Sequence, residues 1–200
     1  MKATVICISH VEGAEGGTVG RAVAEKLGYA FADDAIVSEA ARAAGIFAES
    51  VSYAERKDAK RSIEVDFGRV EKTETLRELI KSAIDSAAER GKIVITSHAA
   101  SYALADREDV LRVLVTAPDE TRVARYAETE GVDAKRAAKE LEESDEGRSA
   151  YLQRFYGVKN EQPTDYDLVL NTEKLGADAA AALIAAAAGH RPRKRSTPAA

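Results

Sequence analysis

Short, almost continuously apolar runs alternate along this 200-residue chain with longer segments of helical periodicity. Because a strand that is apolar throughout must be covered on both faces, this pattern favours a parallel sheet between layers of helices. The four clear strand candidates are residues 4–8, 92–96, 110–115 and 167–170. A weaker fifth candidate surrounds residues 29–31. The sequence therefore predicts an α/β fold in one domain.

Glycines and capping residues mark the ends of the intervening helices. A capping box of Thr75 and Glu78 is expected to start the clearest amphipathic helix, and Pro118 is expected at the first position of the next. Asp133 is expected to cap a long polar helix that follows. The predicted helices span residues 18–27, 34–44, about 75–90, 118–130, 133–156 and 179–188. Residues 46–69 give no element prediction and fall where an inserted binding segment is possible.

Composition narrows the classes of function. Acidic residues outnumber basic ones by 34 to 29, so no broad basic face is available for nucleic acid. The single Cys7 excludes an internal disulfide and is expected to be buried as a small hydrophobe. No secretory signal is evident, and the longest apolar segment, residues 179–188, is about half the ~20 residues that span a membrane. A cytoplasmic protein without a membrane segment is expected, and its oligomeric state is left open.

The first strand leads into a glycine-rich turn and then a helix, which is an arrangement typical of phosphate binding. Gly13, Gly16 and Gly17 allow backbone N–H groups to turn inward, and the helix N-terminus adds positive partial charge. The Thr18 hydroxyl could reach a Mg²⁺ ion. A plain glycine turn remains the alternative.

The turn departs from the phosphate-loop pattern G-x-x-x-x-G-K-S/T, because glycine stands where the lysine is expected. Phosphoryl transfer depends on positioning and electrostatics, so that lysine matters. Glu12 and Glu15 would also oppose a polyphosphate unless they point away or face a metal.

The order of these elements and four short matches resemble the cytidylate-kinase-like family. The matches are residues 9–28, 32–36, 110–113 and 166–172, and the likeness covers about residues 3–188. The resemblance implies a three-layer P-loop NTPase fold: a parallel five-stranded sheet flanked by helices, with the first strand between the third and fourth. It implies one domain over residues 1–188 with a helical lid at about 133–157, and residues 189–200 are expected to form a disordered basic tail.

The same resemblance implies transfer of the γ-phosphoryl group of ATP to CMP or dCMP with Mg²⁺, so nucleotides are the expected partners. Asp33 falls in the segment that holds the acceptor nucleotide. Arg122, Arg125 and Arg148 fall where similar proteins carry phosphate-facing arginines. The alternatives are exposed ion pairs for Arg122 and Arg125 and a helix cap for Asp33.

Three departures from the family remove positive charge: the missing loop lysine, no arginine between Asp33 and Arg42, and Ser97-His98 where relatives often show Gly-Arg. His10 and His98 each follow a strand that the topology places side by side. They could form a site at the strand edge, for phosphate or a shared metal, or be ordinary hydrogen-bonded histidines.

Two other functions stay open. A catalytically weak or inactive nucleotide-binding regulatory protein would account for the missing lysine, and a phosphotransferase with a different acceptor would keep ATP. A serine hydrolase is disfavoured because no G-x-S-x-G elbow is present.

Overall fold

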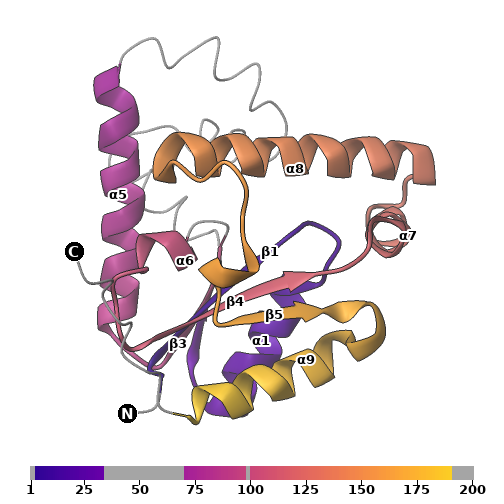
Figure 1. Ribbon diagram of the computed structural model, residues 1–200. Helices are drawn as coiled ribbons and strands as arrows, with labels where there is room; N and C mark the ends of the chain where they lie inside the picture. The colour runs from indigo at the N-terminus through magenta and orange to yellow at the C-terminus, as the bar shows by residue number, and fades with distance from the viewer. Residues whose placement is uncertain (1–2, 34–69, 98–99, 191–200) are drawn as a thin grey trace.

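A five-stranded parallel sheet forms the centre of the protein (Figure 1). The computed structural model describes residues 3–33, 70–97 and 100–190. The strand order is β2-β3-β1-β4-β5, and each neighbouring pair is parallel. The strands are β1 (Val5–His10), β2 (Ala30–Ala32), β3 (Ile93–Thr96), β4 (Val110–Thr116) and β5 (Leu168–Asn171). The predicted sheet, with its first strand between the third and fourth, is confirmed.

Helices cover both faces of the sheet. Helices α1 and α9 pack on one face, and α5, α6 and the end of α8 pack on the other (Figure 1). The described helices are α1 (Gly16–Leu27), α5 (Val70–Glu89), α6 (Ala100–Ala103), α7 (Asp119–Glu130), α8 (Ala134–Tyr156) and α9 (Thr172–Ala188), with a short 3₁₀ helix at Pro163–Asp165. None of the helices in this part of the chain is long and apolar enough to cross a membrane.

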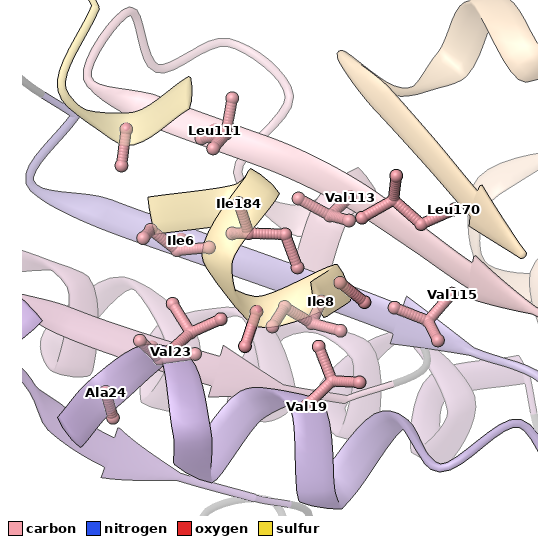
Figure 2. Close-up of a cluster of buried hydrophobic side chains, with 14 of the residues drawn as sticks. Ile6, Ile8, Val19, Val23, Ala24, Leu111, Val113, Val115, Leu170 and Ile184 are labelled. Carbon is pink, nitrogen blue, oxygen red and sulfur yellow. The ribbon is translucent and has the colours of Figure 1, made fainter. Parts of the chain in front are cut away.

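Strand β1 is buried on both sides, as its continuous apolar run predicts. Ile6 and Ile8 pack toward α1 and α9, where Val23 and Ile184 meet them (Figure 2). The alternate residues of β1 pack against the other layer, and they include Cys7, which is fully buried. Burial of a large aliphatic side chain contributes about 2–3 kcal/mol, so this central strand stabilises both layers.

The predicted helix ends are largely confirmed. Gly28 ends α1 with φ +66°, and Gly131 ends α7 with φ +66°. Asp133 caps α8 by accepting a hydrogen bond from the Arg136 backbone N–H at 2.9 Å. Leu141 and Phe155, two of the few apolar residues expected to hold this polar helix, are buried.

Four boundaries were predicted wrongly. Helix α5 begins at Val70, so Thr75 lies inside the helix and cannot cap it. The charged residues before Thr75 are good helix formers, and they extend the helix past the apparent capping box. Pro118 is the residue before the first helical position of α7, and α1 begins two residues earlier than expected. Helix α9 begins at Thr172 rather than 179, but it is kinked at Gly176 (φ +68°), and the part after the kink contains the predicted helix. The predicted helix at 34–44, the 46–69 segment and residues 191–200 of the tail lie outside the described residues.

Candidate phosphate-binding site

The loop between β1 and α1 lies at the carboxyl edge of the sheet, where ligands of open parallel sheets bind. Gly13 has φ +77°, and a Cβ there would lie 2.8 Å from the backbone oxygen of Arg122. Glu15 also has a positive φ of 62° and gives α1 no side-chain cap. The loop is therefore folded tightly against α7, and the first N–H groups of α1 donate no capping hydrogen bond to the Glu15 side chain.

The remaining loop glycines have different roles. A Cβ at Gly16 would lie 2.2 Å from the ring of His10, so this glycine makes room for the histidine. A Cβ at Gly17 would meet nothing within 4 Å, and Thr18 is exposed. His10 Nδ1 lies 3.3 Å from the Val11 carbonyl oxygen. His98 lies outside the described residues, so a paired histidine site stays a prediction.

Arg122 of α7 is 4 % exposed and contacts the loop directly. Its Nε donates to the Glu12 carbonyl at 2.7 Å, and its two terminal nitrogens donate to Asp145 of α8 at 2.8 and 2.7 Å. Burial alone would lower the pKa of this guanidinium, but the bonds and charges of Asp145 and Asp119 raise it. The interpretation as an exposed ion pair is therefore wrong for Arg122, which joins the loop, α7 and α8.

Arg148 of α8 repeats this arrangement from the other side of the loop, with 7 % exposure. Its Nε and Nη2 donate to the Glu161 carboxylate, each at 2.7 Å, and Nη1 donates to the His10 carbonyl at 3.2 Å. Burial opposes the charge, and the Glu161 carboxylate raises the pKa of Arg148 above its ordinary value.

Arg125 of α7 lies on the third side of the loop. It donates to the hydroxyl and the carbonyl of Thr172 at 3.0 Å each, and it pairs with Glu15 at 3.1 Å. The buried Thr172 hydroxyl donates in turn to the Ala14 carbonyl at 3.0 Å. The structure thus brings all three predicted arginines to the loop between β1 and α1.

Asp33 follows β2, at the edge of the sheet away from β5. It pairs with the exposed Arg21 of α1 at 3.3 Å, and the Arg21 guanidinium lies 4.5 Å from the centre of the Phe31 ring. The alternative role of Asp33 as a cap falls on the helix at 34–44, outside the described residues.

A pocket of about 260 Å³ lies beside the loop, between Val11 and helix α8. Asp145 and Arg148 line it from α8, and Lys159 and Glu161 line it from the segment that follows α8. Sequence reasoning missed Asp145, Lys159 and Glu161, because they stand in charged polar stretches with no motif around them. In the described part of the chain, no group of three or more His, Cys, Asp and Glu side chains could hold a metal ion.

The parallel sheet, the loop before α1 and the arginines around it define a P-loop kinase fold. Solved structures agree at the level of the fold. An uncharacterized protein from Eubacterium ventriosum matches with a TM-score of 0.69 and 21 % identity, over 90 % of this chain and 94 % of that one. Shikimate kinase from Bacteroides thetaiotaomicron matches with a TM-score of 0.53 and 15 % identity, over 90 % and 95 %.

The chain belongs to the cytidylate kinase-like family, whose model matches residues 5–174. Among similar curated proteins, the cytidylate kinase of Staphylothermus marinus is 29 % identical over 176 residues, covering 87 % of this chain and 90 % of the relative. The cytidylate kinase of Aeropyrum pernix is 30 % identical over 166 residues, covering 82 % and 87 %. These relatives confirm the resemblance and support a nucleotide kinase role at the level of the family.

Proposed function

We propose that this protein is a nucleoside monophosphate kinase that transfers the γ-phosphoryl group of ATP to CMP or dCMP. An oxygen of the acceptor phosphate attacks the γ-phosphorus, the bond to the β-phosphate oxygen breaks, and ADP and the nucleoside diphosphate leave. Family membership and the names of the archaeal relatives support the class of reaction. The choice of pyrimidine acceptor rests on those names.

The observation that carries the proposal is the burial of Arg122 and Arg148 against the start of the loop, where β1 ends. A plain glycine turn gives no reason to bury two guanidinium groups, because desolvating a charge costs several kcal/mol before its partners offset it. Both groups hold a loop carbonyl, those of Glu12 and His10, and both are held in turn by a carboxylate. Such fixed cations around a loop favour binding of a transferring phosphoryl group.

The loop residues would hold the phosphates of ATP through their backbone. Gly13, Gly16 and Gly17 and the N-terminus of α1 supply N–H groups, and Arg122, Arg125 and Arg148, each paired with a carboxylate, supply directed donors around them. Mg²⁺ commonly binds through one or two protein groups and the substrate phosphates, so a ready-made cage of acids is not needed. The exposed Thr18 hydroxyl at the start of α1 fits that role, and the ion would offset the phosphate charge.

We place the acceptor nucleotide between Asp33 and the pocket beside Val11. The pocket volume of about 260 Å³ lies just below the ~300–1,000 Å³ typical of small-molecule sites. Helix α8, which contributes Asp145 and Arg148 and falls within the range of residues 133–157, is the proposed lid. Closure of α8 over the loop would exclude water from the transfer.

The test is turnover of purified protein with ATP and Mg²⁺ against each common nucleoside monophosphate. CMP or dCMP should give the largest kcat/KM, and Arg125→Gln should lower kcat by roughly 100-fold or more, since a charge stabilising the transferring group is worth at least that much. Arg136→Gln is the matched control: Arg136 forms a similar ion pair with Glu140 on α8 but is exposed. It should change kcat by less than about twofold. No turnover of any monophosphate would refute the proposal.

The alternative is a nucleotide-binding protein of low or no activity, which the glycine at position 17 favours. Calorimetry separates the two, because nucleotide binding without turnover supports the regulatory protein. ATP consumption that CMP does not stimulate would instead indicate a phosphotransferase with another acceptor.

A further inference from the structure

The Arg148 guanidinium is oriented by a carboxylate that belongs to neither the loop nor α8. Glu161 lies in the segment after α8 and accepts two hydrogen bonds from Arg148, each at 2.7 Å. This fork-to-fork geometry fixes the plane of the guanidinium and directs Nη1 to the His10 carbonyl. An arginine has many rotamers, so its direction here depends on Glu161.

Glu161 is itself fixed by Tyr166, whose hydroxyl donates to the same carboxylate. Tyr166 is buried. Burial and the bond to Glu161 raise the pKa of its hydroxyl to about 12, so the hydroxyl stays a donor at any physiological pH. The chain of contacts runs from Tyr166 through Glu161 and Arg148 to the loop.

The segment that carries both residues is also held by helix α6, which lies on the same face of the sheet as the end of α8. Asp165 accepts a hydrogen bond from the Gln162 backbone N–H at 2.8 Å and another from the Tyr102 hydroxyl of α6 at 3.2 Å. The rings of Tyr102 and Tyr166 meet edge to face with centres 6.2 Å apart. Glu161 therefore lies in an exposed segment that Asp165 and Tyr166 fasten to α6.

We infer that Glu161 and Tyr166 are positioning residues that aim Arg148 at the group transferred over the β1–α1 loop. This inference rests on the proposed function. Tyr166 acts only through Glu161, while Glu161 also lines the pocket with Arg148. Loss of either should disturb the reaction more than it disturbs the fold.

The protein contains a matched triad that makes the inference testable. Tyr126 donates to Glu140 at 3.1 Å, and Arg136 donates to the same carboxylate at 3.0 Å. This second triad has the same chemistry on α7 and α8, but its arginine is 61 % exposed and makes none of the loop contacts described for Arg148. Comparison of equivalent variants therefore separates the loss of a tyrosine–glutamate bond from the loss of Arg148 orientation.

The experiment compares Tyr166→Phe and Glu161→Gln with Tyr126→Phe and Glu140→Gln in the full chain. We expect kcat to fall about tenfold in the first two, as loss of a bond to a charged group predicts, with KM for ATP changed by less than about threefold. The two control variants should keep kcat within about twofold. Affinity for inorganic tripolyphosphate, measured by calorimetry with Mg²⁺ present, should fall about threefold in the first two variants alone.

The outcomes are distinguishable. If the wild type turns over and Tyr166→Phe behaves like Tyr126→Phe, the positioning role is wrong while the proposed function stands. If no monophosphate is phosphorylated, the proposed function fails and tripolyphosphate binding decides the inference. Equal affinities across the four variants, or no tripolyphosphate binding by the wild type, would then overturn it.

Discussion

Replacement of Gly13 by alanine tests how tightly the β1–α1 loop packs against α7. Two features oppose a side chain at this position. The residue has φ +77°, and a Cβ would lie 2.8 Å from the Arg122 carbonyl oxygen and 3.0 Å from the Arg122 Cα. Real Cβ atoms essentially never approach backbone atoms that closely, so either the loop or α7 must move.

Gly28 provides the matched control, because its φ of +66° is similar and a Cβ there would meet nothing within 4 Å. Gly28→Ala should lower the free energy of unfolding by about 1–2 kcal/mol, because alanine is strained in the left-handed conformation. Gly13→Ala should cost that amount plus about 1–3 kcal/mol for the forced contact, which is the usual range for overpacking. For a chain of this size the extra loss lowers Tm by about 3–9 °C beyond the control.

Urea and thermal unfolding of the two variants give the comparison, and tripolyphosphate calorimetry gives a second readout. Gly13→Ala should also weaken binding, since displacement of the loop moves the N–H groups that face the ligand, whereas Gly28→Ala should leave binding unchanged. Equal destabilisation of the two variants would show that α7 moves away at no cost, and the argument for a loop held tightly against Arg122 would be refuted.

Three further predictions follow from single sites. Gly17→Lys, where a Cβ meets nothing within 4 Å, should tighten ATP binding roughly 3–10-fold by calorimetry, while Gly17→Gln should not. The Arg107 guanidinium holds the pKa of Asp109 below its ordinary 3.8, so the stability that Asp109 contributes is present above about pH 4 and lost as the pH falls through the lowered pKa. Asp109→Asn should reduce this loss of stability at low pH, measured by urea unfolding at several pH values. A loss as large as that of the wild type would contradict this assignment. Burial raises the pKa of the Cys7 thiol to about 12, so a thiol reagent should label it only after unfolding in guanidinium chloride; labelling of the native protein at pH 8 would show that the strand opens.

The sheet was predictable because its signals are local. Each apolar run became a strand within about two residues, since continuous apolarity is a property of the segment itself. Gly28, Gly131 and Asp133 could be assigned for the same reason, because a left-handed residue or a side-chain cap acts within one turn. The start of α5 was missed because Thr75 and Glu78 match a capping box that the helix formers before them override.

The partners of the arginines were not predictable from local signals. The family resemblance indicated Arg122, Arg125 and Arg148, but each of them also binds a segment far away in the sequence. Arg125 and Thr172 are 47 positions apart, and Arg148 and the His10 carbonyl are 138 apart. No periodicity or cap connects such pairs, and only the tertiary packing of α7, α8 and α9 around the loop brings them together.

The balance of charges around the loop determines how a site without the lysine could hold a polyphosphate. Three guanidinium groups surround it, yet each is already paired with a carboxylate: Arg122 with Asp119 and Asp145, Arg125 with Glu15, and Arg148 with Glu161. The acids therefore outnumber the arginines before any nucleotide arrives. Backbone N–H groups and the helix N-terminus contribute only partial charge. A bare polyphosphate would meet little net positive charge, so we expect the nucleotide to bind with a divalent cation that carries the charge the missing lysine would have supplied, while the arginines contribute direction.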